Sequence, residues 1–392
     1  MPIKTLKLFF IVEKIGPYHN ARFNYLAKEK GLLIHVIETN PLSTTYLWDQ
    51  KLNINYKVYK LDRSCKECSY STKISNQINQ FLFSNKPDII FVTGWYDSTH
   101  HYLIYKSHNK RIPLILLSDS RYKDEKRILL KETIKKILLN SFSSAIVAGK
   151  ESRDYLLRLK FKNENIFSPI NVVDNNFFYK SNYKEKLPYS NYFLCIARFV
   201  TKKNHESLIK AFEIYKNNNG KFNLLIIGSG PKEEIIKRLI NKSKFKNSIF
   251  IDSWKQINEL PKYYKNAKAI ILPSLTDQWG LVINEAMACG KPCIVSKNCG
   301  CYLDLIEESK TGWGFDPKNI KELACLLNKF ETISYKELNK LENNIKIKIR
   351  KYDLDSFSDA VNKAIYKASQ NKKFSLISSI IAYLIFKIKK KE

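Results

Sequence analysis

The sequence predicts an α/β protein in which two doubly wound parallel sheets are followed by a helical segment. Short apolar runs alternate with longer amphipathic runs, a pattern typical of parallel strands that helices cover on both faces. The alternation stops at the polar, lysine-rich stretch 180–191 and then starts again. At 392 residues, the chain is long enough for two domains of ordinary size.

The first half of the chain contains five apolar runs that we interpret as buried strands. They are LKLFFIV (6–12), LLIHVIE (32–38), DIIFVTG (88–94), IPLILLSD (112–119) and SSAIVAG (143–149). Helix-like stretches separate them, so we expect one doubly wound domain over 1–180. The first run carries Lys7 and is followed by Glu13 without a small-residue cleavage site, which favours a strand over a signal peptide.

The second half repeats this organisation and predicts a second doubly wound domain over 190–352. Its apolar runs are YFLCIAR (192–198), FNLLIIG (222–228), SIFIDSW (248–254), AKAIILPS (267–274) and PCIVS (292–296). Ligands of open α/β sheets bind beyond the carboxyl ends of the strands. We therefore expect the two domains to face each other across a ligand-binding cleft.

The charge balance is strongly basic, with 67 Lys and Arg against 37 Asp and Glu, a net charge of +30. The lysines are spread over nearly every segment and not gathered in one arm or stripe, and no aromatic-basic motif of the known nucleic-acid modules is present. We interpret the charge as the result of biased residue usage in a protein with an ordinary fold. It favours phosphate-bearing partners but predicts no specific nucleic acid.

The eight cysteines do not form a disulfide or zinc pattern. Cys65 and Cys68 make one CxxC without a second pair of ligands, so we expect no metal there. Cys299 and Cys301 alternate along a loop and have no expected role. The others lie in apolar or helix-like runs and suit a reducing compartment, and they are Cys195, Cys289, Cys293 and Cys325.

The most informative stretch is LPSLTDQWGLVINEAMACGKPCIVS (272–296). Gly280 permits a sharp turn after a strand, and the following residues read as a helix that ends at Gly290. The free N–H groups near Gly280 and Leu281, together with the positive end of the helix dipole, suit a diphosphate. Glu285 lies about one turn further on, where a carboxylate can accept hydrogen bonds from ribose hydroxyls.

Two further loops carry candidate ligand-binding residues. ARFVTKKN (197–204) places Arg198 and Lys203 five residues apart after a strand, which makes a cationic clamp for a diphosphate. In GSGP (228–231), Gly228 and Gly230 permit close backbone approach to a ligand, or shape a turn.

In these motifs the chain resembles the retaining glycosyltransferases of glycosyltransferase family 4, which have the GT-B fold. That family carries Glu-x7-Glu followed by AMACGxP, an Arg-x4-Lys and a GxGP. This sequence has Asp277-x7-Glu285, AMACGKP, Arg198-x4-Lys203 and Gly228-Ser-Gly230-Pro231, in matching order and spacing across 190–320.

The resemblance implies transfer of a sugar from a nucleotide diphosphate sugar to an acceptor hydroxyl, with retained anomeric configuration and no further cofactor. By carry-over, Arg198 and Lys203 neutralise the leaving diphosphate, Glu285 holds the ribose and Asp277 contacts the donor sugar. Asp277 departs from the family, which has Glu there, and this leaves the donor sugar open. No metal is expected, because preorganised cations stabilise the leaving group directly.

The first domain offers two weaker candidates, Gly16 after the first strand and Asp119 after the fourth. The family uses a glycine-bearing loop at the first position, and many relatives carry His at the second. We expect Gly16 to line the cleft and Asp119 to contact the acceptor or the donor sugar.

The end of the chain is expected to hold two different segments. In the resembled family the last helix often crosses back to the first domain, and we assign this crossing to 354–370. The tail 371–392 combines the apolar run Phe374–Phe386 with the lysine-rich KIKKKE. It is too short to span a bilayer but suits an anionic membrane surface, with simple docking on the first domain as the alternative.

The expected function is therefore envelope polysaccharide or glycolipid synthesis by a cytoplasmic enzyme on the inner face of the cell membrane, with a glycan or lipid-linked acceptor. Two other classes stay open. A nucleotide-sugar epimerase can share the two-domain fold, although the sequence lacks an evident acid/base set for it. A non-catalytic basic protein that binds nucleotides or nucleic acid is the other alternative.

Overall fold

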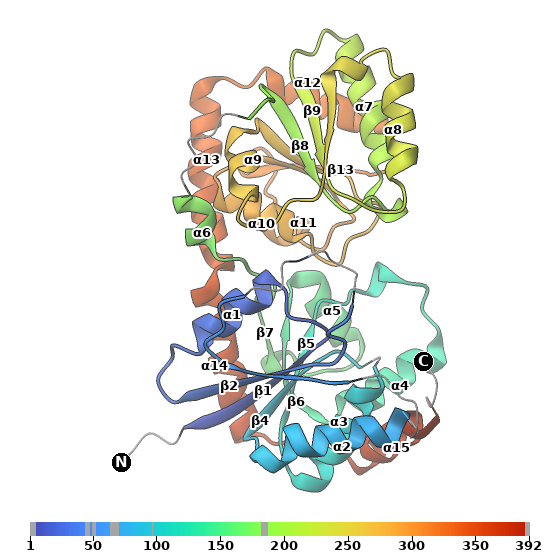
Figure 1. Ribbon diagram of the computed structural model, residues 1–392, viewed down its shortest axis with the longest axis vertical. Helices are drawn as coiled ribbons and strands as arrows, with labels where there is room; N and C mark the ends of the chain where they lie inside the picture. Colours follow the sequence, from blue (N-terminus) through green and yellow to red (C-terminus); the bar gives the residue numbers. More distant parts are fainter. Residues whose placement is uncertain are drawn as a thin grey trace. The chain divides into compact units, whose positions relative to one another are not determined.

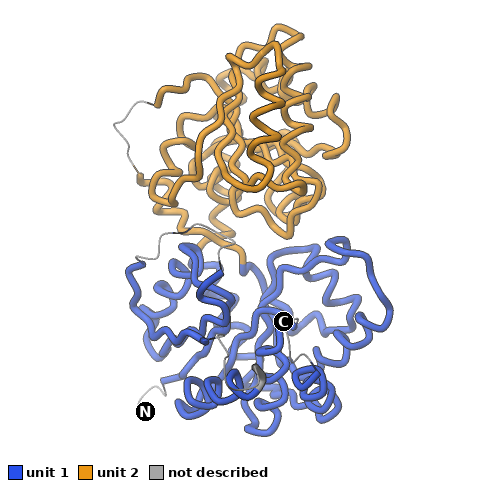
Figure 2. Tube along the Cα trace, turned by 45° about the vertical axis from the view of Figure 1, so that its right-hand side comes forward, with its two compact units in different colours: residues 1–170, 354–392 blue, residues 171–353 orange. Residues whose placement is uncertain are grey.

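The computed structural model describes residues 5–43, 48, 52–62, 70–95, 97–181 and 187–388. The chain divides into two compact units, residues 1–170 with 354–392 and residues 171–353 (Figure 2). Residues 171–180, which the sequence assigned to the first domain, thus belong to the second unit, where the Nδ2 of Asn284 donates a hydrogen bond to the carbonyl of Asn171 at 3.3 Å.

Unit 1 is a seven-stranded parallel sheet with the strand order β3-β2-β1-β4-β5-β6-β7 (Figure 1). Its strands are β1 (Leu6–Val12), β2 (Leu32–Glu38), β3 (Lys57–Lys60), β4 (Ile89–Thr93), β5 (Leu114–Ser118), β6 (Phe142–Val147) and β7 (Ile166–Phe167). Its helices are α1 (Pro17–Leu26), α2 (Tyr70–Phe81), α3 (Ser98–Lys110), α4 (Leu129–Leu139), α5 (Lys150–Arg158), α14 (Leu354–Gln370) and α15 (Leu376–Ile388).

Unit 2 is a six-stranded parallel sheet with the order β10-β9-β8-β11-β12-β13. Its strands are β8 (Tyr192–Ile196), β9 (Asn223–Ile227), β10 (Ile249–Asp252), β11 (Ala269–Leu272), β12 (Cys293–Ser296) and β13 (Gly312–Phe315). Its helices are α6 (Asn175–Lys180), α7 (His205–Asn217), α8 (Glu233–Lys242), α9 (Leu260–Asn266), α10 (Leu281–Ala288), α11 (Tyr302–Leu305), α12 (Ile320–Glu331) and α13 (Tyr335–Ile349).

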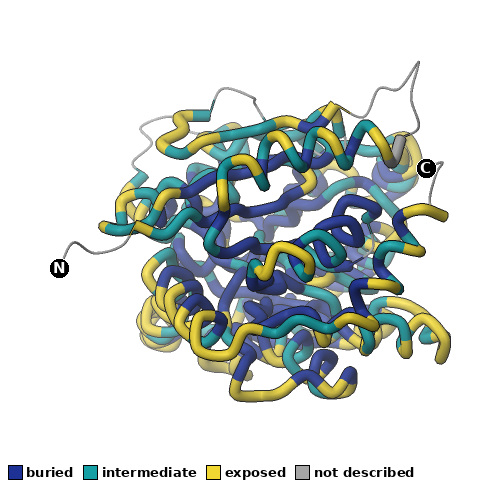
Figure 3. The backbone as a smooth tube through the Cα atoms, turned by 90° about the horizontal axis from the view of Figure 1, so that it is seen from below, coloured by how far each residue is buried: buried dark blue, intermediate teal, exposed yellow. Residues whose placement is uncertain are grey.

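Each sheet has its own apolar core between its strands and helices. The strand residues are buried on both faces, as the continuous apolar runs predict. Figure 3 shows buried and exposed segments alternating along the outer helices, as expected for helices with one packed face. The predicted fold class, two doubly wound parallel sheets with a C-terminal helical segment, is confirmed.

The chain returns to unit 1 through α14. The hydroxyl of Ser144 on β6 donates a buried hydrogen bond of 2.9 Å to the carbonyl of Ala364, and α14 also packs against α1. The following helix, α15, lies against α3 and α4. Residues 376–388 are therefore docked on the first unit, which is the alternative that the sequence left open for the tail. Lys389, Lys390 and Lys391 lie outside the described residues.

Within the described ranges, no helix combines the length and the apolar content that crossing a membrane requires.

Candidate functional site

The sheet of unit 2 has a topological switch point between the neighbouring strands β8 and β11. From β8 the chain continues to β9 on one side, whereas from β11 it continues to β12 on the other side. The loops beyond the carboxyl ends of such a strand pair diverge and leave room for a ligand. Arg198 and Lys203 lie in the loop after β8, and Asp277 lies in the loop after β11.

The loop after β8 is held in a defined conformation. Lys203 ends a 3₁₀ turn (Thr201–Lys203), and Asn204 follows in the left-handed region with φ of 57°. The amide of Asn204 donates hydrogen bonds to the carbonyls of Pro273 (3.1 Å) and Pro317 (2.9 Å). Asn204 therefore ties the Lys203 turn to the segment that follows β11. The sequence reasoning missed this residue, although asparagine next to a turn is a signal for a left-handed position.

The two loops are joined by an ion pair between candidate residues. The ammonium of Lys203 donates a hydrogen bond to Oδ2 of Asp277, and the two side chains are only 16% and 13% exposed. The N–H of Leu275 also donates to the carbonyl of Lys202 at 2.8 Å. The structure thus brings together Lys203 and Asp277, which lie 74 residues apart in the sequence.

Asp277 is also tied to the loop after β12. Its carbonyl accepts a hydrogen bond of 2.9 Å from the N–H of Gly300, and the amide of Asn298 donates to the carbonyl of Leu275 at 3.1 Å. These bonds fix the backbone on both sides of the Asp277 carboxylate. Asn298 is a second positioning residue that the sequence did not reveal.

Helix α10 begins beside this carboxylate. Gly280 precedes it with φ of 105°, a conformation that side chains rarely adopt, and a Cβ there would lie 2.6 Å from the Leu272 side chain and 3.8 Å from Oδ2 of Asp277. The first N–H groups of an α-helix lack intrahelical acceptors and carry partial positive charge. The start of α10 at Leu281 therefore lies close to the Lys203–Asp277 pair.

Glu285 occupies a different environment from that of the other candidates. Its side chain has no exposed area, and its Oε2 accepts a hydrogen bond of 2.6 Å from the hydroxyl of Tyr264 on α9. It stands in the second turn of α10, so it is not a first-turn residue that interacts with the dipole. Tyr264 was not singled out from the sequence, because an aromatic residue on an amphipathic helix is expected to belong to the hydrophobic core.

The two glycines of GSGP make close contacts with the protein's own backbone. A Cβ on Gly228 would lie 2.0 Å from the carbonyl oxygen of Ala197, and one on Gly230, where φ is 148°, would lie 2.8 Å from that of Phe199. The N–H of Phe199 donates to the carbonyl of Ser229 at 2.8 Å. These glycines therefore let the loop after β9 pack against the loop that carries Arg198, which is itself half-buried.

His205 lies directly behind the Lys203 turn, at the start of α7. Burial, with Lys203 as a smaller contribution, lowers the pKa of His205 to about 4. The imidazole is therefore neutral at neutral pH and adds no positive charge to the candidate site.

In unit 1, Gly16 and Asp119 follow two different strands of the sheet, β1 and β5. Gly16 is the N-cap residue of α1, and a Cβ there would lie 3.2 Å from Nε1 of Trp48. Asp119 is half-buried, and its carbonyl accepts a hydrogen bond of 3.1 Å from Ser152. The nearby Arg22 is largely buried, and its guanidinium donates a hydrogen bond of 2.6 Å to the carbonyl of Ile170. Arg22 therefore fixes the backbone at Ile170, where the first segment of unit 1 ends.

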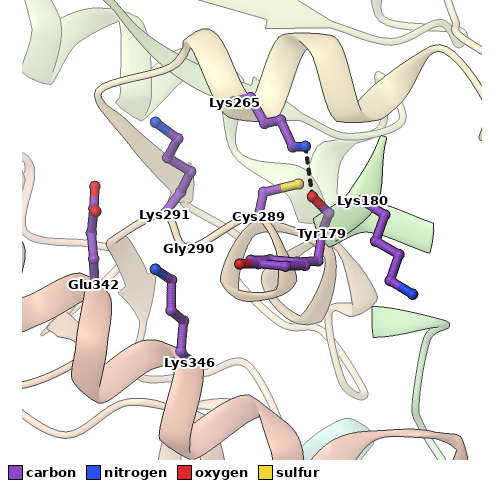
Figure 4. Close-up of a pocket in the computed structure, with 8 residues that line it drawn as sticks. All are labelled: Tyr179, Lys180, Lys265, Cys289, Gly290, Lys291, Glu342 and Lys346. Carbon is purple, nitrogen blue, oxygen red and sulfur yellow. Dashed lines mark hydrogen bonds between the residues drawn. The ribbon is translucent and has the colours of Figure 1, made fainter. Parts of the chain in front are cut away.

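A cavity of about 550 Å³ lies near the opposite end of α10 (Figure 4). Its lining comes from four segments, namely Tyr179, Lys180, Lys265, Cys289, Gly290, Lys291, Glu342 and Lys346. None of the candidate ligand-binding residues is among them. Arg198, Lys203 and Asp277 lie on the loops around the switch point and not at this cavity.

Among the described residues, no group of three or more His, Cys, Asp and Glu side chains is placed to hold a metal ion. Cys65 and Cys68, for which the sequence predicted no metal, lie outside the described residues.

Known glycosyltransferases and a solved structure are similar to this chain in sequence or in fold. An uncharacterized glycosyltransferase of Haemophilus influenzae is 27% identical over 303 residues, which cover 77% of this chain and 82% of that protein. The amylovoran biosynthesis glycosyltransferase AmsK of Erwinia amylovora is 32% identical over 140 residues, only 34% of each chain. The crystal structure of Anabaena HepE in complex with UDP is similar over 92% of this chain and 100% of its own, with a TM-score of 0.70 and 16% identity.

The family model described as glycosyl transferases group 1 matches residues 180–348, which contain Arg198, Lys203, Asp277 and Glu285. Over these residues the chain is similar to the group 1 glycosyl transferases, and its two doubly wound units have the architecture of the GT-B fold.

Proposed function

We propose that this enzyme transfers a glycosyl group from a nucleoside diphosphate sugar to a hydroxyl of a glycan or lipid-linked acceptor, with retention of the anomeric configuration. The observation that carries the proposal is the Lys203–Asp277 ion pair at the switch point, next to the start of α10. The cation and the helix N-terminus there suit the diphosphate of such a donor, and the carboxylate suits the hydroxyls of its sugar.

The chemistry requires stabilisation of the leaving group. When the bond between the anomeric carbon and the diphosphate breaks, negative charge grows on the diphosphate oxygens. Arg198, Lys203 and the N–H groups at the start of α10 supply preorganised positive charge for these oxygens, and such groups lower the barrier because they need no rearrangement during the step. The acceptor hydroxyl attacks from the face that the diphosphate leaves, and a phosphate oxygen accepts its proton.

The Lys203–Asp277 pair gives each charge a partner before the donor arrives. On donor binding, the diphosphate provides a second anion for Lys203, and Asp277 accepts hydrogen bonds from the sugar hydroxyls. Because aspartate is one methylene shorter than the glutamate of the resembled family, the carboxylate stays close to the backbone that Gly300 and Asn298 hold. We infer that Asp277 selects the donor sugar through this position.

Glu285 is proposed to act on the ribose. Its buried carboxylate is oriented by the Tyr264 hydroxyl, and a buried acceptor discriminates strongly in favour of a ligand that supplies a hydrogen-bond donor. In unit 1, Gly16 and Asp119 are proposed acceptor-side residues.

The donor and acceptor classes have support from relatives. HepE has been solved with UDP and with UDP-glucose, and the name of AmsK assigns it to amylovoran biosynthesis. We propose a nucleotide diphosphate sugar as the donor and a role in envelope polysaccharide or glycolipid synthesis at the cytoplasmic face of the membrane. We also propose that no divalent cation is needed, since Arg198 and Lys203 supply the positive field.

The proposal is tested by incubating the full chain with nucleotide sugars of the uridine, guanosine and adenosine families and a hydroxyl-bearing acceptor lipid or oligosaccharide. Formation of a glycosylated acceptor with the donor's anomeric configuration, read from its anomeric proton coupling, is the expected result. Interconversion of the nucleotide sugar without any acceptor would instead support an epimerase.

A further inference from the structure

Helix α15 presents an apolar face to solvent. The five side chains on this face are each more than half exposed, and they are Leu376, Ile377, Ile380, Leu384 and Ile388. At about 100° per residue they cover one continuous third of the helix circumference. A helix at the surface of a monomer normally has polar residues in this position, so the apolar face indicates a contact that unit 1 does not supply.

The opposite face of α15 is firmly packed. Ser378, Ala382 and Phe386 are buried, and the hydroxyl of Ser378 donates a hydrogen bond of 2.6 Å to the carbonyl of Ile137 on α4. The ring of Phe386 lies 5.0 Å from that of Tyr102 on α3. The helix is therefore fixed on unit 1, and the direction of its apolar face is set by this packing.

The beginning of α4, a helix that contacts α15, exposes a second apolar group. Ile128, Leu129 and Leu130 are exposed by 52%, 84% and 70%, and the helix that follows them contacts α15 (Figure 1). We call the exposed apolar side chains of these two helices the α4/α15 surface; they are Ile128, Leu129, Leu130, Leu376, Ile377, Ile380, Leu384 and Ile388. The sequence pointed only to the α15 part of this surface.

The charged side chains of these segments favour an anionic partner. Lys136, Lys372 and Lys387 are exposed on α4, before α15 and on α15. The acidic residues beside α4 are already engaged, since Glu132 pairs with Lys135 at 2.9 Å and Glu125 pairs with Arg127 at 3.0 Å. Apolar side chains with a basic fringe match the headgroup region of an anionic leaflet better than a protein partner of ordinary composition.

We propose that the α4/α15 surface docks unit 1 onto an anionic lipid bilayer. The apolar side chains of both helices enter the boundary between headgroups and acyl chains, while the lysines contact lipid phosphates. The inference rests on the proposed function: docking on the bilayer would bring the enzyme to an acceptor that is confined to the membrane. The docking surface itself is argued from unit 1 alone.

The experiment is co-sedimentation of the full chain with vesicles, in the absence of donor. We expect binding to vesicles of phosphatidylcholine with phosphatidylglycerol, and binding weaker by about tenfold or more to pure phosphatidylcholine vesicles or at high salt. A chain that stays in the supernatant with the anionic vesicles overturns the proposal.

Three variants test which residues bind. Ile380→Gln with Leu384→Gln changes α15, Leu129→Gln with Leu130→Gln changes α4, and Ile347→Gln is the matched control, since it is a 63% exposed apolar residue on α13 of unit 2. We expect each double variant to lose anionic vesicle binding by about tenfold or more, with an unchanged Tm, and the control to bind like the wild type. Wild-type binding by either double variant contradicts the composite surface.

Two further readouts separate this proposal from others. A wild-type dimer in solution that the double variants convert to a monomer, without vesicle binding, would assign the surface to a second copy of the chain and overturn the lipid proposal. Nucleotide binding, measured on the same proteins without vesicles, tests the proposed function separately. The double variants should retain it in full.

Discussion

Lys203 and Asp277 form an ion pair that joins the loops after two neighbouring strands of unit 2, β8 and β11. Both side chains are largely shielded from solvent, so their attraction is screened less than that of a surface pair. The start of α10 lies next to the pair. An incoming diphosphate and sugar would therefore meet charges whose positions are already set.

Replacing Lys203 with alanine should reduce the transfer rate strongly. A charge-assisted contact to the leaving diphosphate contributes roughly 1.5–3 kcal/mol, which corresponds to a loss of about tenfold to more than a hundredfold in kcat/KM. The matched control is Lys202→Ala, because this neighbouring lysine has an exposed side chain. Equal rates for the two variants, each corrected for folded protein, would remove Lys203 from the site.

Asp277→Glu should change the donor preference more than the stability. The longer side chain moves the carboxylate about one methylene further from the loop that Gly300 holds, toward the position of the glutamate in the resembled family. We expect altered ratios of kcat/KM among donor sugars and a Tm close to that of the wild type. A large fall in Tm with unchanged donor ratios would instead mean that Asp277 only stabilises its loop.

Glu285→Gln tests whether the buried carboxylate acts on a ligand. The amide oxygen of glutamine can still accept from Tyr264, so the Tm should stay near the wild-type value while transfer falls by about tenfold or more. Tyr264→Phe is the companion variant. It leaves a buried acceptor without this donor and should lower the free energy of unfolding by about 1–3 kcal/mol.

These two variants distinguish a ligand-binding role of Glu285 from a structural one. Wild-type turnover per folded molecule in Glu285→Gln would show that Glu285 supports the packing of α9 on α10 and does not contact the donor.

Gly230→Ala should lower both stability and activity. The new Cβ would lie 2.8 Å from the carbonyl oxygen of Phe199, and a φ of 148° strains any residue with a side chain, so we expect a destabilisation of about 1–3 kcal/mol. The displacement would also move the loop that carries Arg198. Gly290→Ala is the control, because its Cβ would meet only the end of Lys346 at 3.8 Å and its φ of 75° costs about 1 kcal/mol. Equal turnover per folded molecule in the two variants would separate Gly230 from the site.

Sequence patterns were sufficient for the fold class because each buried strand of a parallel sheet is a continuous apolar run. All ten predicted runs coincide with strands, from β1 to β12. Among the described residues, the three strands that were not predicted lack that signal. β3 (KVYK) is a half-exposed edge strand, β7 has two residues, and β13 (GWGF) contains two glycines. In β13 a Cβ on Gly312 would lie 2.1 Å from the carbonyl oxygen of Cys293, so close strand contact replaces side-chain packing there.

The candidate site was predicted only in part. Motif spacing identified Lys203 and Asp277, but not that they pair, because contact between residues 74 positions apart depends on the order of β8 and β11 in the sheet. Asn204 and Asn298 act through backbone carbonyls, a role that residue type alone does not reveal. The burial of Glu285 depends on the packing of α9 against α10, and α9 lies outside the sequence motif.

The most direct test of the central claim is calorimetric titration of the full chain with UDP, GDP and ADP, in the presence of a metal chelator. We predict that one of these nucleotides binds the wild type without a divalent cation. The same nucleotide should bind Lys203→Ala about tenfold more weakly or worse, and bind Lys202→Ala like the wild type. The account would be contradicted if none of the three binds, if binding appears only when magnesium or manganese is added, or if Lys203→Ala binds as tightly as the wild type.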